Sequence, residues 1–154
     1  MKKITRLRGL LLLLLVSSVF QLQAQKEDKA IKEVINHFFE AMQSGDTATL
    51  KNTCTEEPVL QTYMKDKDDN LQIFTDNFND FVKFVGNPGT DKFKEEITFD
   101  AIHTEMSLAS VWTPYTFYLN GKVSHCGTNS FQLIKTAAGW KIQYIIDTRR
   151  KGCK

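Results

Sequence analysis

The spacing of apolar residues changes once along this chain, near Gly89, and this change limits the folds open to it. Before Gly89 apolar residues recur every three or four positions, and after it they alternate with polar residues in segments 92–104, 108–119, 122–135 and 140–149. The first pattern is typical of amphipathic helices and the second of half-buried strands. The sequence therefore predicts an α+β domain in which three N-terminal helices pack on an antiparallel sheet.

The three helices are expected at 28–44, from 47 to about 54, and at 71–85. Ser44-Gly45-Asp46 ends the first, Pro58 lies beyond the second, and Gly86-Asn87-Pro88-Gly89 ends the third. A short strand is expected at 59–64, followed by a charged loop at 65–70. The periodic phenylalanines of the helices are predicted to be core residues: Phe38, Phe39, Phe74, Phe78 and Phe81.

The first 24 residues have the layout of a secretory signal peptide. Lys2, Lys3, Arg6 and Arg8 precede an apolar run of 12 residues at 9–20. A helix that crosses a bilayer needs about 20 such residues, so a retained anchor is the weaker interpretation. We expect cleavage after Ala24, which would leave residues 25–154 as a single periplasmic or secreted domain without a membrane span.

Removal of this leader changes the sign of the net charge. The full chain has 20 Lys and Arg against 18 Asp and Glu, and residues 25–154 keep 16 of the basic residues and all of the acidic ones. The net charge therefore falls from +2 to −2. This balance argues against a nucleic-acid partner, which requires a basic surface.

Neither the cysteines nor the histidines have metal-site spacing. We therefore predict that the protein binds no metal and no cofactor. The cysteines and histidines considered are Cys54, Cys126, Cys153, His37, His103 and His125. An odd number of cysteines in an exported chain allows at most one internal disulfide, and the sequence leaves the pairing open. His125-Cys126 is not expected to be a catalytic pair, because neighbours on a strand point to opposite faces.

The strongest turn signal is Asn120-Gly121, which suits a two-residue hairpin loop. That loop predicts Tyr118 opposite Val123, Thr116 opposite His125 and Trp112 opposite Asn129. A second turn at 136–139 predicts Phe131 beside Tyr144, Leu133 beside Ile142 and Asn129 beside Ile146. The face predicted to turn inward is then Trp112, Thr116, Tyr118, His125, Asn129, Phe131, Leu133, Trp140, Ile142, Tyr144 and Ile146. The outer face is predicted to hold Thr113, Tyr115, Ser124, Thr128, Ser130, Gln132, Lys141, Gln143, Asp147 and Arg149.

The element order and three segments resemble the NTF2-like superfamily over residues 27–150. These segments are Val34 to Asp46, Ala109 to Tyr115 and Gly139 to Ile142. The resemblance implies the cone shared with ketosteroid isomerases, SnoaL-like cyclases and scytalone dehydratases, in which helices cover a curved antiparallel sheet. Asn120 to Gly127 and Ile146 to Lys151 are similar to small exported bacterial proteins described as lumazine-binding.

Three functions remain open at this point. The first is a non-catalytic domain that holds a small planar or apolar molecule, with ligand contacts from Trp112, Thr116, Tyr118, His125, Asn129, Phe131, Trp140 and Tyr144. The second is an isomerase, dehydratase or hydrolase with His125 as general base, although His125 alone is as well explained as a structural histidine. The predicted inward face has no Asp or Glu in the last three strands, which argues against catalysis. The third is an interaction module, a homodimer through Tyr115, Gln132 and Gln143 of the outer face.

Overall fold

The computed structural model describes the backbone of residues 2–153 and the side chains of residues 23–153. The chain divides into two compact units, Met1–Ala30 and Ile31–Lys154. The first unit is helical where it is described and forms the beginning of α1 (Lys2–Ser44). The predicted signal peptide lies almost entirely outside the residues with described side chains and stays a prediction. Among the described residues, no helix is long and apolar enough to cross a membrane.

Two of the predicted helices of the second unit are confirmed. Ile31, Ile35 and Phe38 of α1 are buried, as their spacing predicts. The short helix α2 (Thr47–Thr53) begins at Asp46, whose side chain accepts hydrogen bonds from two backbone amides of the first turn. Such a cap satisfies amides that have no partner within the helix.

The third predicted helix begins later than expected, because residues 71–76 form a strand. That strand, β2 (Leu71–Asp76), pairs antiparallel with β1 (Cys54–Lys65), and α3 (Phe78–Gly86) follows it. Asp66 closes the hairpin by accepting from the backbone amides of Asp68 and Asn70. The helical spacing of the apolar residues in 71–76 buries none of them, since all of β2 is exposed. The hydrogen bonds to β1 therefore decide the structure of this segment. Phe74 is accordingly 49% exposed and is not a core residue.

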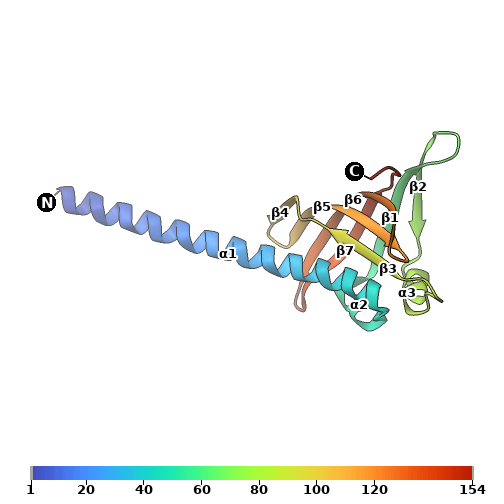
Figure 1. Ribbon diagram of the computed structural model, residues 1–154. Coiled ribbons are helices and arrows are strands. Elements are labelled where there is room, and N and C mark those ends of the chain that lie inside the picture. The colour runs from blue at the N-terminus through green and yellow to red at the C-terminus, as the bar shows by residue number, and fades with distance from the viewer. Residues whose placement is uncertain (1, 154) are drawn as a thin grey trace. The chain divides into compact units, whose positions relative to one another are not determined.

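The sheet has seven strands and is mixed, where an antiparallel sheet was predicted (Figure 1). After β1 and β2 come β3 (Phe93–Ile97), β4 (Ala101–Glu105), β5 (Leu108–Leu119), β6 (Lys122–Thr136) and β7 (Gly139–Thr148). The strand predicted at 92–104 is thus divided into β3 and β4. The order in the sheet is β2-β1-β7-β6-β5-β3, and β4 also pairs with β5. The pair β1 and β7 is parallel and brings residues 54–63 beside residues 142–148.

The hairpin of β5 and β6 begins with the predicted two-residue turn. Asn120 and Gly121 both have positive φ, 54° and 76°, and Tyr118 lies opposite Val123 as predicted. A β-bulge then leaves Ser124 unpaired, so that Phe117 lies opposite His125. An extra residue in one strand reverses the face of every later pair.

This bulge overturns the predicted face of β5. Thr113, not Trp112, lies opposite Asn129. Thr113 and Tyr115 are buried on the inner face, while Trp112 is 47% exposed. The prediction that Tyr115 belongs to the outer face is therefore wrong, and so is the inward placement of Trp112 and Thr116.

A second β-bulge, in β7, changes the other half of the predicted register. Leu133 lies opposite Ile142 as predicted, but Gln143 is left unpaired and Gln132 lies opposite Tyr144. Asp147 consequently lies opposite Asn129 and is buried. The predicted pairs of Phe131 with Tyr144 and of Asn129 with Ile146 are wrong, as is the outward placement of Asp147.

The helices cover the inner face of the sheet, the face on which the inward residues of β6 were predicted to lie. Phe39 of α1 packs edge-on against Phe131 of β6, with ring centroids 6.0 Å apart, and Phe38 stacks on Phe81 of α3 at 6.2 Å. Phe131 and Leu133 are fully buried there. The predicted core role of Phe38 and Phe39 is confirmed.

One disulfide joins Cys126 of β6 to Cys153 near the C-terminus. The backbones of Cys126 and Arg150 also exchange two hydrogen bonds, so the last residues are held against β6. Cys54 is free and buried, and burial raises the pKa of its thiol to about 12. Cys54 is therefore protonated and unreactive at neutral pH.

Gly127 allows the close approach of β6 to the end of β7. A Cβ atom at this position would overlap the carbonyl oxygen of Thr148 and lie 2.9 Å from the ring of Tyr115. Gly127→Ala should therefore lower the free energy of unfolding by about 3 kcal/mol, measured by urea denaturation. Ser130→Ala, on the same strand but partly exposed, should change it by less than about 0.5 kcal/mol. Equal effects of the two substitutions would contradict the close packing.

Candidate functional site

A cavity of about 640 Å³ opens between the helices and the concave face of the sheet. Side chains of α1, α3 and strands β1, β3, β5, β6 and β7 line it. Much of its wall is aromatic, formed by Phe38, Phe39, Phe81, Phe84, Phe93, Tyr115 and Phe117. Volumes of a few hundred Å³ with apolar walls are typical of small-molecule sites.

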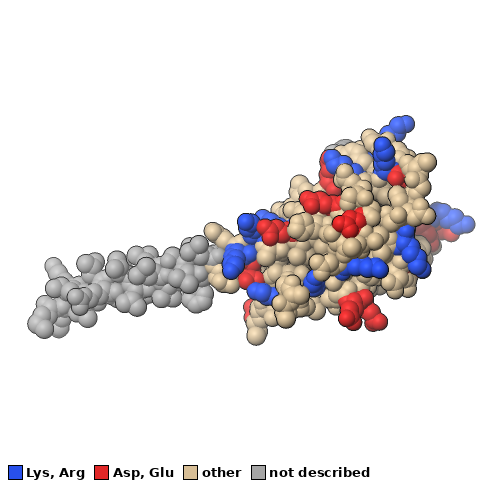
Figure 2. Space-filling model, turned by 90° about the horizontal axis from the view of Figure 1, so that it is seen from below, with Lys and Arg blue, Asp and Glu red and all other residues tan. Residues whose placement is uncertain are grey.

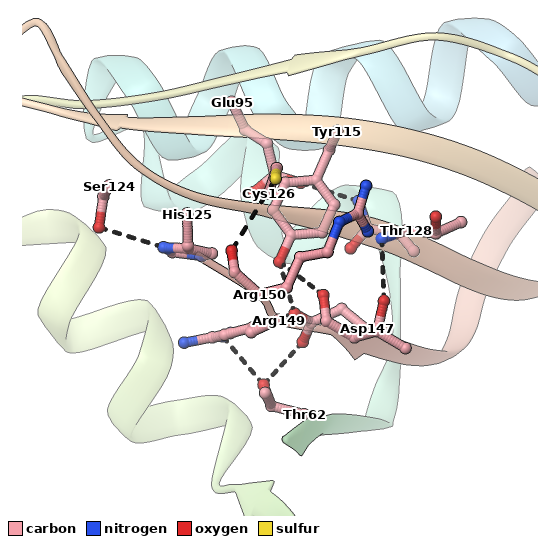
Figure 3. Close-up of polar contacts among 12 residues, drawn as sticks. Thr62, Glu95, Tyr115, Ser124, His125, Cys126, Thr128, Asp147, Arg149 and Arg150 are labelled. Atoms are coloured by element: carbon pink, nitrogen blue, oxygen red, sulfur yellow. Dashed lines mark hydrogen bonds and ion pairs between the residues drawn. The ribbon is translucent and has the colours of Figure 1, made fainter. Parts of the chain in front are cut away.

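Asp147 is the centre of a hydrogen-bonded group at the sheet side of this cavity (Figure 3). Its Oδ1 accepts from the hydroxyl of Thr62 at 2.7 Å, and its Oδ2 accepts from the hydroxyl of Tyr115 at 2.8 Å. Arg149 donates to the same carboxylate at 3.1 Å and to Thr62 at 2.9 Å. A buried carboxylate needs such donors, because leaving it unpaired costs several kcal/mol.

Glu95 of β3 forms a second polar group in the cavity wall. Its Oε1 accepts from the side-chain amide of Asn129 at 2.8 Å. Burial raises the pKa of Glu95 to about 7, the negative charge of Asp147 adds to this increase, and the hydrogen bond from Asn129 opposes it. Glu95 therefore changes between neutral and charged forms near physiological pH.

His125 packs among aromatic rings beside these groups. Its ring is stacked on Phe117 with centroids 4.8 Å apart and meets Tyr115 edge-on at 5.8 Å. Its Nδ1 lies 3.2 Å from the hydroxyl of Ser124. Burial, together with the nearby positive charge of Arg149, lowers the pKa of His125 below its usual value. The imidazole is consequently neutral at neutral pH.

The structure brings two of the eight predicted ligand contacts into the cavity wall, His125 and Asn129. Phe131 and Trp140 are buried in the core and do not line the cavity. The other four belong to the outer side of the bulged strands: Trp112, Thr116, Tyr118 and Tyr144. The hydroxyl of Tyr118 donates to Glu96, and that of Tyr144 donates to Gln61.

The sequence analysis missed polar groups from β3, β5 and β7 and from Arg149, which directly follows β7. Asp147, Tyr115 and Arg149 were placed on the outer face, because a bulge cannot be recognised in the spacing. Glu95 could have been found, since it lies between Phe93 and Ile97 in strict alternation and shares their face. The expectation that the inner face has no Asp or Glu in the last three strands is wrong, because Asp147 of β7 lies in the cavity wall.

The acid–base pair that was considered for His125 is not formed. His37 and His103 are exposed and lie outside the cavity wall. Within residues 23–153, the His125 ring forms its side-chain hydrogen bond with the hydroxyl of Ser124. Among the described residues, aromatic packing and a hydroxyl hold the ring, and no ionisable side chain is in hydrogen-bond contact with it.

Three of the solved structures that resemble this chain are NTF2-like proteins. An NTF2-like protein with a cystatin-like fold from Novosphingobium aromaticivorans has a TM-score of 0.67 at 14% identity, covering 88% of this chain and 89% of that one. An NTF2-like protein of unknown function from Shewanella baltica has a TM-score of 0.61 at 16% identity, covering 82% and 96%. A third, from Silicibacter pomeroyi, has a TM-score of 0.64 at 9% identity, covering 82% and 98%.

The chain has the NTF2-like fold. No family model and no curated protein matches the sequence itself. The predicted NTF2-like fold is confirmed by these structures, with a mixed sheet in place of the antiparallel one. The similarity to lumazine-binding members stays a prediction. The NTF2-like fold leaves the function to the residues inside the cone, because one fold serves many functions.

Loss of the Tyr115 hydroxyl should destabilise the NTF2-like domain. Tyr115→Phe removes a donor from buried Asp147, so the free energy of unfolding should fall by about 1 to 3 kcal/mol, measured by urea denaturation. Tyr118→Phe is the matched control, because its hydroxyl bonds to Glu96 at the surface, and it should leave the stability unchanged. If Tyr115→Phe and Tyr118→Phe changed the free energy of unfolding equally, the structural role of Asp147 would be contradicted.

Proposed function

We propose that this protein is an exported NTF2-like domain that binds a small molecule with an apolar or planar body in its aromatic cavity. The observation that supports this proposal is the cavity itself, about 640 Å³ in volume and lined by aromatic rings. The rings would pack against the body of the ligand, and burial of that apolar surface would supply most of the binding free energy.

The polar side of the cavity would orient the ligand. Asp147 is already bound by Thr62, Tyr115 and Arg149, so this group is a rigid support. In the described part of the chain, Glu95 forms its hydrogen bond through Oε1, which leaves Oε2 for a ligand. A few fixed polar groups in an apolar pocket are sufficient to select one orientation.

Acid–base catalysis is a second candidate function, and one observation favours it. The carboxyl group of Glu95 lines the cavity and has a pKa of about 7, a value suited to proton transfer at neutral pH. This makes Glu95 a better candidate base than His125, the residue expected from the sequence. Chemical conversion of a bound molecule, lost in Glu95→Gln, would favour catalysis over simple binding.

The proposed export is supported by the cysteine chemistry. A disulfide such as Cys126–Cys153 persists in oxidising compartments. It agrees with the secretory layout of residues 1–24 and with a periplasmic or secreted location.

A homodimer through the outer face of the sheet is also proposed. This face carries exposed Trp112 and the hydrogen-bonded pair Ser110 and Gln132. Tyr115, which was expected to take part in the dimer, is buried in the cavity wall instead.

The surface charges support the proposal that nucleic acid is not a partner. Figure 2 shows basic and acidic side chains interspersed on the visible face of the described residues, without a continuous basic stripe.

Binding can be tested with N-phenyl-1-naphthylamine, a neutral fluorophore whose emission rises in apolar sites. Titration should give a saturable increase in fluorescence. Leu119→Trp enlarges a side chain of the cavity wall and should weaken binding by roughly tenfold, equivalent to about 1.4 kcal/mol. Val123→Trp, on the same hairpin but outside the wall, should leave binding unchanged. Absence of saturable binding would refute the proposed function.

Export can be tested by expressing the full chain in a Gram-negative host and separating the cell fractions. The intact mass of the protein from the periplasm or medium should correspond to residues 25–154 with one disulfide. Replacement of Leu12 and Leu13 by Arg should interrupt the apolar run and leave the protein uncleaved in the cytoplasm. An uncleaved protein from the unmodified chain would contradict the proposal.

A further inference from the structure

We propose that the cavity selects organic cations, meaning molecules in which a protonated amine or quaternary ammonium group is attached to an aromatic or other apolar body. The inference depends on the proposed binding function and specifies the chemical class of the ligand. It is based on the charges and the aromatic rings that share the cavity wall.

The charged side chains of the cavity wall are mostly acidic. Among the described residues that line it, Arg149 is the cationic one, and His125 is neutral at neutral pH. The acidic residues of the wall are Asp76, Asp80, Asp91, Glu95 and Asp147. A cavity with this balance attracts cations and repels anions.

The pairing of these charges identifies Glu95 as the group that a ligand cation would meet. Arg149 already neutralises Asp147 at 3.1 Å. Asp76, Asp80 and Asp91 are exposed, so water and salt screen their charges, and Asp80 also pairs with Lys83. Glu95 lies inside the wall and receives a hydrogen bond from the neutral amide of Asn129. No Lys or Arg of the described residues forms a salt bridge with it, so its charge is available to a ligand.

A row of aromatic rings favours the same class of ligand. Phe84 and Phe93 have centroids 5.0 Å apart, Phe93 and Phe117 stack at 6.2 Å, and Phe117 stacks on His125. The face of a phenylalanine ring carries partial negative charge and attracts cations, an effect that is larger in desolvated sites. Apolar burial and cation attraction therefore act on the same molecule.

Binding of a cation should be linked to ionisation of Glu95. The charged or titratable groups that act on Glu95 are Asp147, Arg149 and Tyr115. The same wall also contains His125, Asp76, Asp80 and Asp91. From α1 the wall receives the uncharged Phe38, Phe39 and Met42. A bound cation stabilises the carboxylate and lowers the pKa of Glu95 from about 7. Affinity should therefore rise with pH toward this value and become constant above it.

Three naphthalene probes of similar shape can test the inference by isothermal titration calorimetry. They are 1-naphthylmethylamine, which is cationic at neutral pH, the neutral 1-naphthylmethanol and the anionic 1-naphthoate. Above the pKa of Glu95 the amine should bind at least about tenfold more tightly than the alcohol, and the naphthoate should bind most weakly. Amine affinity should fall by up to about tenfold per pH unit below that pKa, whereas alcohol affinity should not change.

Two variants separate the role of Glu95 from general electrostatics. Glu95→Gln should reduce the preference for the amine to within about threefold and remove its pH dependence. Alcohol binding should persist, which shows that the variant is folded. Glu96→Gln is the matched control, because Glu96 lies on the outer face and pairs with Lys94 at the surface. It should keep the full preference.

The outcomes distinguish this inference from the proposed function. If the alcohol binds as tightly as the amine, or the naphthoate binds most tightly, the inference is wrong and the binding function stands. A preference for the amine that survives Glu95→Gln overturns the assignment to Glu95. If the three probes and N-phenyl-1-naphthylamine all fail to bind, the proposed function fails as well.

Discussion

The carboxylate of Asp147 is buried inside the domain, and the site depends on the donors that reach it. A lone buried charge is costly, so Thr62, Tyr115 and Arg149 must all be held in place. They come from β1, from β5 and from the residue that directly follows β7. These three strands are therefore fixed relative to one another by the same interaction that shapes one side of the cavity.

The sequence predicted the local elements well because they depend on neighbouring residues. The helical spacing around Ile35 and the turn at Asn120-Gly121 each involve a few adjacent positions, and both are confirmed. The parallel pairing of β1 with β7 could not be predicted, since it joins segments about 85 residues apart in hydrogen bonds such as Thr62 to Asp147. Pairing of that kind leaves no periodic signal in the chain.

The candidate site was predicted in part, and the two bulges explain the difference. The inward face of β6 was correct, so His125 and Asn129 were found. The unpaired residues Ser124 and Gln143 reverse the faces of the neighbouring strands, and neither has a composition that marks a bulge. Bulges are frequent next to functional sites, where they redirect side chains. Here they bring the hydroxyl of Tyr115 and the carboxylate of Asp147 into the cavity wall, and the rings of Trp112 and Tyr144 lie on the outer side.

The state of the cysteines has a consequence for oxidative folding. Cys54 is enclosed by the packing of α2 and β1 and keeps its proton, so after collapse it cannot attack another sulfur. Thiolates carry out exchange, and a buried thiol is excluded from it. Cys126 and Cys153 then have a single possible partner each. Once the domain is folded, Cys126–Cys153 is therefore the internal bridge that can form.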